Sequence, residues 1–261
     1  MRAPIVDVGN ATPGIPFADP APELNPDLDG RVLAHEFRKS GRIHIPNVLT
    51  EASARRVFHA LEHETPWSVL FNEGNEHLEI ARIPPGEQQK LTLAAWDRAR
   101  SGFQFLYRHH RLSDNREPYP KPGHYLGKIA EFLTSRELMG FIREVTGEDA
   151  VVWASAHATL YMPLDFLTIH DDNIPENDRR VAYVLNMTPN WRPDWGGALQ
   201  FFDRPDHIEE AYLPAFNALN LFRVPKLHSV AQVAPFGGMR YAVSGWFHAG
   251  KPGENVALSR S

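Results

Sequence analysis

The sequence predicts an α+β fold in which helices pack on one outer face of a β core. Helix-like patterns lie in the first half of the chain, and the second half is a series of short β-like runs separated by Gly, Pro, Asn and Asp clusters. Short strands at close spacing are typical of a sandwich or barrel, and helices that precede strands favour segregation of the two. The length of 261 residues is enough for one large domain with a buried core.

The first 30 residues are rich in proline and poor in periodic apolar positions, so we expect an extended or poorly ordered N-terminal arm. Residues 31–261 contain no repeat and no linker and are expected to form a single domain. Within it, residues 31–150 are expected to be a helical support region and residues 151–250 the strand core.

Helices are predicted where apolar residues recur at helical spacing. Thr50 is a candidate N-cap, and Gly41 and Gly147 are placed to end two of the helices. The predicted helices cover residues 32 to about 41, residues 51 onward, roughly residues 91–106 and about residues 135–146. A short strand over residues 42–46 is predicted from the alternation of apolar and polar side chains.

The strand core is predicted from eight short apolar runs bounded by turn-forming residues. These runs are residues 151–156, 158–161, 166–170, 182–187, 198–202, 218–224, 228–233 and 240–247.

Composition limits the classes of function. The net charge of −5 and the pI near 6.2 give no basic surface for a nucleic-acid backbone, so no nucleic-acid partner is expected. The absence of cysteine excludes thiolate zinc sites, iron–sulfur clusters and cysteine nucleophiles, so any metal must be held by His, Asp or Glu. No signal-peptide pattern and no run of roughly 20 apolar residues is found, so we expect a cytoplasmic protein without a membrane partner. Monomer and homodimer both remain open.

A metal site is predicted from His170, Asp172 and His228. In a strand, residues two apart face the same way, so His170 and Asp172 are expected to share a face while Asp171 points away. His228 opens a separate β-like run and supplies a second imidazole. Two imidazoles and one carboxylate form the facial triad of non-haem Fe(II) oxygenases. The alternative is that His170 is a surface histidine beside acidic residues.

Arg240 is a candidate anion-binding residue, because a guanidinium binds a carboxylate bidentately and stays protonated. Its strand is expected to place Arg240, Ala242, Ser244 and Trp246 on one face, at the mouth of the barrel. The other face, with Met239, Tyr241, Val243 and Phe247, is expected to pack under the helices. The alternative is an arginine in a surface ion pair.

Other histidines are given no functional role. His157 is expected to be a hydrogen-bonded core residue, and the alternative is that it points inward with Tyr161 on the same strand face. His109, His110, His207 and His248 are expected to be solvated or incidental.

Over residues 150–250 the chain resembles the 2-oxoglutarate- and Fe(II)-dependent dioxygenases, and within them the prolyl 4-hydroxylase-like group. The resemblance lies in H-x-D at residues 170–172, an apolar strand that ends in Leu-Asn at residue 186, W-x-x-x-W-G-G-x-L over residues 191–199, the late His228 and the run R-Y-A-V-S-G-W-F-H from Arg240.

The resemblance implies a double-stranded β-helix core of the jelly-roll, cupin-like type. It implies His170, Asp172 and His228 as the catalytic iron ligands. Arg240 would bind the distal carboxylate of 2-oxoglutarate, at a position where many prolyl hydroxylases have lysine. Tyr161 and Ser244 are expected to help to bind the co-substrate, and Trp246 to wall the substrate cavity.

The implied activity is hydroxylation of a C–H bond with release of succinate and CO₂, using Fe(II), 2-oxoglutarate and O₂, with ascorbate as a further candidate cofactor. The expected substrate is a prolyl or other residue of a protein or peptide, and a free amino acid or small metabolite is the alternative. Two other classes remain: a cupin-like enzyme with another metal, and a non-catalytic sensor domain. Residues 67–96 are a hypothetical substrate lid.

Overall fold

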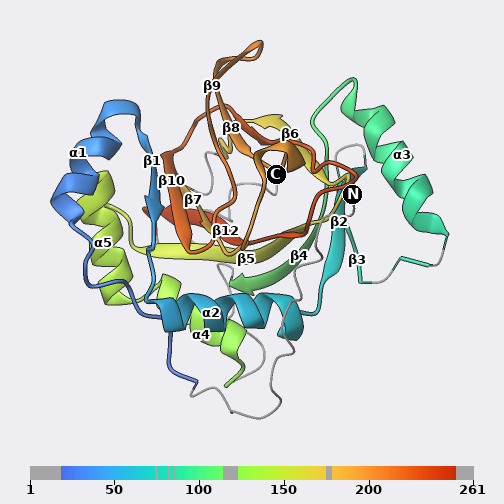
Figure 1. Cartoon of the computed structure of the whole chain (residues 1–261). Helices are drawn as coiled ribbons and strands as arrows, with labels where there is room; N and C mark the ends of the chain where they lie inside the picture. The colour runs from blue at the N-terminus through green and yellow to red at the C-terminus, as the bar shows by residue number, and fades with distance from the viewer. Residues whose placement is uncertain are drawn as a thin grey trace, which may run out of the picture.

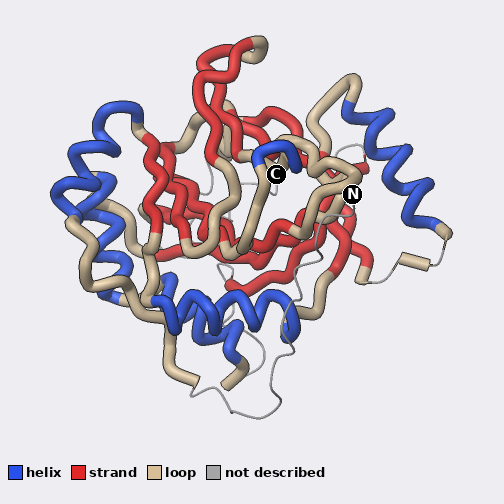
Figure 2. Tube along the Cα trace, viewed as in Figure 1, coloured by secondary structure: helices blue, strands red, loops and turns tan. Residues whose placement is uncertain are grey.

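A computed structural model describes residues 19–73, 76–81, 83–84, 86–113, 123–174 and 178–250, which form helices around a curled 12-stranded sheet (Figures 1 and 2). All pairings in the sheet are antiparallel. In sheet order the strands are β1 (Arg42–Pro46), β10 (Ala218–Arg223), β7 (Arg179–Asn186), β12 (Arg240–His248), β5 (Trp153–Tyr161), β4 (Phe105–Ser113), β6 (Phe166–His170), β11 (His228–Val230), β8 (Leu199–Arg204) and β9 (His207–Tyr212). Off this path, β2 (Ser68–Glu73) pairs with β4 and with β3 (Glu76–Ile80).

The helices begin and end where the sequence provides caps. They are α1 (Gly30–Ser40), α2 (Glu51–His59), α3 (Glu87–Ala99), α4 (Tyr125–Leu133) and α5 (Arg136–Thr146). The side chains of Asp29, Thr50 and Ser135 accept hydrogen bonds from backbone N–H groups in the first turns of α1, α2 and α5. Gly41 and Gly147, with φ of 69° and 71°, end α1 and α5 in the left-handed conformation that glycine adopts without strain.

The two faces of β12 separate the core from the cavity. Tyr241, Val243 and Phe247 are buried in the main apolar core, which also contains residues from α1, α2, α4 and α5. On the opposite face, Arg240 and Trp246 line a cavity inside the curled sheet. This division follows from the alternation of side chains along a strand.

The helix α3 lies away from the other helices, across the sheet from α1 and α5 (Figure 1). Its Ala95 packs in a separate apolar cluster with Val69 and Phe71 of β2, Leu106 of β4 and Phe166 of β6. The β2–β3 hairpin and α3 therefore share a small core of their own beside the cavity.

The two ends of the strand order, β1 and β9, meet through side chains. Arg42 of β1 forms ion pairs with Glu209 at 3.0 Å and Glu210 at 2.5 Å, both on β9. The rings of His44 and Tyr212 lie 5.5 Å apart across the same gap. We call this contact the β1–β9 seam, defined by these five residues.

The structure confirms the predicted β core with helices packed outside it. It corrects several of the predicted elements. The predicted helix over residues 91–106 is wrong beyond Ala99, because Phe105 and Leu106 open β4 and are buried by pairing with β6 and β2. The two predicted strands over residues 151–161 are one strand, β5. The sequence did not predict α4, β2, β3, β4 or β9. Residues 31–150 thus supply strands as well as helices, while residues 1–18 of the predicted arm lie outside the described residues. Among the described residues, no helix is long and apolar enough to cross a membrane.

Candidate metal centre and its cavity

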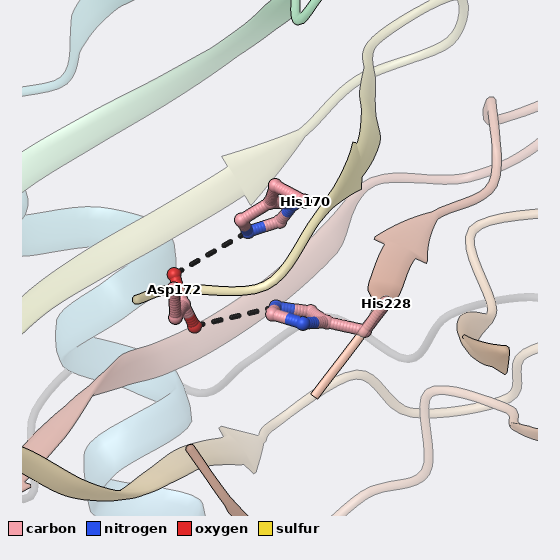
Figure 3. A group of neighbouring side chains, drawn as sticks. All are labelled: His170, Asp172 and His228. Atoms are coloured by element: carbon pink, nitrogen blue, oxygen red, sulfur yellow. Dashed lines mark ion pairs between the residues drawn. The ribbon is translucent and has the colours of Figure 1, made fainter. Parts of the chain in front are cut away.

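His170, Asp172 and His228 lie together, with the Asp172 carboxylate facing both imidazoles (Figure 3). His170 is the last residue of β6 and His228 is the first of β11, and the two are paired directly across these antiparallel strands. One ligand atom from each of the three residues lies within 4.8 Å of the others.

Asp172 reaches this point by a route that the sequence did not predict. The strand β6 ends at His170, so alternation along a strand does not place Asp172 beside it. Instead, Asp172 has a φ of 61°, in the left-handed backbone region that residues other than Gly, Asn and Asp rarely adopt. A left-handed turn directs the carboxylate toward the imidazoles.

The distances suit a metal ion bound by these three side chains. Asp172 Oδ1 is 3.4 Å from His170 Nε2, and Asp172 Oδ2 is 3.3 Å from His228 Nε2. Donor atoms around one metal with bonds of about 2.1 Å lie roughly 3 Å apart when they are adjacent.

The outer nitrogens of the two imidazoles fix their tautomers. His170 Nδ1 lies 3.0 Å from the carbonyl of Thr168, and His228 Nδ1 lies 2.7 Å from the carbonyl of Lys226. A carbonyl only accepts, so each Nδ1 must carry a proton. In the neutral ring, Nε2 is then a lone-pair donor. Two such lone pairs facing a carboxylate repel it unless a cation lies between them, so the donor set fits a divalent metal.

Burial alone would raise the pKa of Asp172, but hydrogen bonds and charge interactions with His170 and His228, which those imidazoles offer when they are protonated, hold the pKa well below its usual range. When both rings are neutral, a metal cation between the same groups would favour the ionised carboxylate in their place. Arg179, the first residue of β7, lies 3.7 Å from Oδ1 and donates a hydrogen bond to the carbonyl of Asp172 at 3.3 Å. The guanidinium of Arg179 stacks on the ring of Trp246, 3.6 Å from the ring centre, in a cation–π contact.

Arg240 is almost fully buried, at 2% exposure, and has no acidic partner among the described residues. Its Nη2 donates a weak hydrogen bond to Asn186 Oδ1 at 3.4 Å, and its Nε has no hydrogen-bond partner. The ring of Tyr161, directly across from it on β5, lies 5.0 Å away. Burial lowers the pKa of Arg240, as expected for a cation without a counter-charge.

The three residues of the metal site and Arg240 line one cavity of about 810 Å³, a size typical of small-molecule sites. Tyr161, Ser244 and Trp246, each predicted to belong to the site, also line it. The ring of Tyr161 stacks on Tyr107 at 4.9 Å, and burial raises the pKa of Tyr161 well above its usual range, so its hydroxyl stays protonated.

The hydroxyl of Ser244 lies 3.3 Å from His157 Nε2, so it contacts another side chain of the protein. The ring of Trp246 packs against the guanidinium of Arg179, which in turn contacts Asp172. Both residues are therefore engaged by other side chains within the cavity wall.

Sequence reasoning missed several cavity residues. Arg179 and Tyr107 line the cavity without having been predicted, and His157 lines it beside Tyr161, which is the alternative to a core role. Of the histidines expected to be solvated or incidental, His109 and His248 are buried and line the cavity, so they are not solvated. The available signal was the alternation along β4 and β5, which places Tyr107 and His109, or His157 and Tyr161, on one face. Because the start of β4 lies in a segment predicted as helix, the alternation along β4 gave no expectation for Tyr107 or His109.

The second glycine of the Trp-Gly-Gly block, Gly197, lies beside the side chains of Trp191 and Arg240. Both glycines have positive φ, 68° at Gly196 and 66° at Gly197. A Cβ at Gly197 would lie 2.9 Å from the Trp191 ring and 3.4 Å from Arg240 Cδ. Glycine is thus required at Gly197 both by the backbone conformation and by the close approach of the Trp191 ring, and Arg240 Cδ lies in ordinary contact beside it.

A family model described as the 2OG-Fe(II) oxygenase superfamily matches residues 156–248 of the chain. Curated relatives include the prolyl 3-hydroxylase OGFOD1 of Mus musculus, 28% identical over 44% of this chain and 22% of that protein. The OGFOD1 of Xenopus laevis is 35% identical over 32% of this chain and 17% of that protein. The matched regions thus span about a fifth of the length of these relatives.

Solved structures share the fold at low sequence identity. A 2OG-Fe(II) oxygenase family oxidoreductase from Burkholderia pseudomallei has a TM-score of 0.59 and 14% identity, and the match covers 88% of this chain and 97% of that one. A prolyl hydroxylase from Trichoplax adhaerens, solved with a hypoxia inducible factor peptide fragment, has a TM-score of 0.59 and 16% identity, covering 84% and 89%. These likenesses establish the double-stranded β-helix fold.

Proposed function

We propose that the protein is an Fe(II)- and 2-oxoglutarate-dependent dioxygenase that hydroxylates a residue of a protein or peptide, in the first place proline. The proposal is supported by the match of residues 156–248 to the 2OG-Fe(II) oxygenase family model and by the similarity to relatives named prolyl 3-hydroxylases. One observation carries the proposal: a His-Asp-His cluster and a buried arginine without an acidic partner line the same cavity. A metal site alone would also suit a hydrolase, but an uncompensated guanidinium beside it suits an anionic co-substrate.

The side chains divide the work of binding. His170, His228 and Asp172 would hold Fe(II) through Nε2, Nε2 and a carboxylate oxygen. Bound iron and 2-oxoglutarate supply the oxidising chemistry, in which decarboxylation of the co-substrate to succinate and CO₂ is coupled to hydroxylation of a C–H bond. Arg240 would bind the distal carboxylate of 2-oxoglutarate, and the stacked pair of Tyr161 and Tyr107 would exclude water from it.

The chain's own hydrogen bonds keep the metal ligands in place. The carbonyls of Thr168 and Lys226 hold both imidazoles in the tautomer that offers Nε2. Arg179, resting on Trp246, holds the backbone of Asp172 in its left-handed turn. None of these groups has to gain or lose a proton for the proposed reaction.

A peptide substrate is supported by the names of the relatives and by the shape of the cavity. The curated relatives are named prolyl 3-hydroxylases, and one structural neighbour was solved with a peptide fragment. Phe103 and Ile174 line the cavity and are themselves exposed, so the cavity reaches the surface. Leu70, His77 and Glu79 of the β2–β3 hairpin also line it, within the segment hypothesised to be a lid.

The decisive assay is succinate formation from 2-oxoglutarate with Fe(II), O₂ and ascorbate as reductant. His170→Ala is expected to abolish it, because two of three ligands cannot hold the iron in the required geometry. His207→Ala is the matched control, since His207 is an exposed histidine of β9, outside the cavity. Equal turnover by wild type and His170→Ala would refute the proposal, as would a wild-type protein that binds no 2-oxoglutarate with Mn(II) in calorimetry.

The substrate class is tested on intact proteins. Active enzyme is expected to add 16 Da to a prolyl residue in candidate proteins or peptides, and NMR of the product assigns the ring position. If hydroxylation occurs only on free amino acids or small metabolites, the peptide part of the proposal is wrong and the dioxygenase part stands.

A further inference from the structure

Asn186, the last residue of β7, is fully buried beside Arg240. Its side-chain amide nitrogen donates to the carbonyls of Val184 at 3.3 Å and Ala218 at 3.4 Å. Because a carbonyl only accepts, these two contacts belong to the amide nitrogen, and Oδ1 is left to accept from Arg240 Nη2 at 3.4 Å. Asn186 therefore contacts the guanidinium through a neutral oxygen.

Among the described residues, two other arginines are buried, Arg42 and Arg56, and both are paired with acids. Arg42 contacts Glu209 and Glu210, and Arg56 contacts Asp19 and Glu64. An aspartate at position 186 would have nearly the same shape as asparagine and would give Arg240 the same kind of partner. The chain has the neutral side chain at this position.

We infer that Asn186 is a positioning residue that orients Arg240 without cancelling its charge, and so reserves the guanidinium for the distal carboxylate of a five-carbon keto diacid. This inference rests on the proposed function, because it takes 2-oxoglutarate as the ligand of Arg240. A buried cation has favourable electrostatics only with a counter-charge, and the neutral oxygen of Asn186 leaves that counter-charge to the co-substrate.

The charge and the shape of the side chain at position 186 can be separated with two variants. Asn186→Asp and Asn186→Leu both remove the amide N–H donors, but only Asn186→Asp adds a negative charge. We expect Asn186→Asp to bind 2-oxoglutarate, with Mn(II) in calorimetry, about 10- to 100-fold more weakly than Asn186→Leu does, since its carboxylate competes for Arg240. Equal affinities of the two variants would overturn the inference.

The orienting role has its own measurement, which also serves if Asn186→Asp does not fold. Asn186→Leu frees the guanidinium to take other positions, so we expect it to lower the preference of the site for 2-oxoglutarate over the longer 2-oxoadipate, measured as the ratio of the two Kd values. An unchanged ratio would overturn the orienting role.

The interaction between positions 186 and 240 can also be measured without ligand, by a double-mutant cycle of unfolding free energies in urea. We expect Asn186→Asp to lower the unfolding free energy less in the protein with Arg240 than in the Arg240→Met variant, because Arg240 can pair with the new carboxylate. Asn217→Asp, at a buried asparagine that bonds the backbone of Leu49, is the control for a charge placed in the core away from Arg240. It should show no such coupling and bind 2-oxoglutarate normally; coupling equal to that at position 186 would overturn the inference.

Failure of the inference is distinguishable from failure of the proposed function. A wild-type protein that binds no 2-oxoglutarate refutes the function, whereas normal wild-type binding with no difference between Asn186→Asp and Asn186→Leu refutes only the role of Asn186.

Discussion

The β1–β9 seam and the cavity each contain a buried arginine, and the two arginines have opposite surroundings. Arg42 in the seam is 7% exposed and contacts Glu209 and Glu210, whereas Arg240 in the cavity is 2% exposed and contacts a neutral amide. In the seam the two glutamates raise the pKa of Arg42 even though burial opposes them, and in the cavity burial lowers the pKa of Arg240.

The difference separates a structural ion pair from a binding group. The charge of Arg42 is satisfied within the chain, where it joins the two edge strands that share no backbone pairing in the sheet order. Arg240 has no acidic partner among the described residues, and under the proposed function an anionic co-substrate would supply its counter-charge. We therefore expect stability to depend on the first arginine and ligand affinity on the second, and each arginine can be tested for the role of the other.

The largest expected effect is that of Arg240→Met on co-substrate binding. We expect the variant to lose roughly 2–5 kcal/mol of affinity for 2-oxoglutarate, measured by calorimetry with Mn(II), because a buried carboxylate would lose its counter-charge. Its unfolding free energy without ligand should equal or exceed that of the wild type, since an unpaired buried charge is removed. A large loss of stability with unchanged affinity would reverse the assignment of roles.

The second effect is a pH dependence that arises on the cavity side. Burial lowers the pKa of His157 to about 3, below the value of about 6.5 expected in the unfolded chain. As the pH falls below 6.5 the unfolded state takes up a proton that the folded state does not, so stability is lost from pH 6.5 downward. Between pH 6.5 and 5 the expected loss is about 2 kcal/mol.

Glu209 in the seam titrates in a different window. The hydrogen bonds from Lys226 and Arg42 lower its pKa, so its contribution is present above the unfolded value and is lost only as the pH falls below about 4.5. The unfolding free energies of wild type and His157→Gln, measured in urea at pH 6.5 and pH 5, separate the contribution of His157 from that of Glu209. We expect the wild type to lose more stability over this range than His157→Gln does, and equal losses would show that His157 does not cause the loss.

The smallest effect is expected from Arg42→Met in the seam. The glutamates are partly exposed, at 36% and 41% for their side chains, and can be solvated when the arginine is lost. The expected loss of stability is therefore about 1 kcal/mol, measured by urea unfolding. The affinity for 2-oxoglutarate should not change, and a shift comparable to that of Arg240→Met would show that the seam also shapes the cavity.

Much of the fold was predictable because its signals are local. The caps at Thr50, Gly41 and Gly147 fixed helix ends, and the strands of the second half were found from short apolar runs. The strand β4 was not found, because Arg108, His109, His110 and Arg111 interrupt its apolar pattern. Its two edges also pair with strands that are distant in the sequence, such as β2 and β5. Pairing over long sequence distances gives a strand no local signature.

The sequence alone determined the chemistry available: without cysteine, a metal site must be built from His, Asp and Glu, and H-x-D with a late histidine named the three residues that the structure brings together. Tertiary structure decided how Asp172 turns toward the imidazoles, because backbone conformation after a strand end depends on contacts such as that with Arg179. Tertiary structure also decided which arginine has an acidic partner. Arg42 and Arg240 are the same residue type in the sequence, and Arg42 meets Glu209 only because the sheet curls. Ion pairing depends on distance in space, and the linear sequence does not contain that distance.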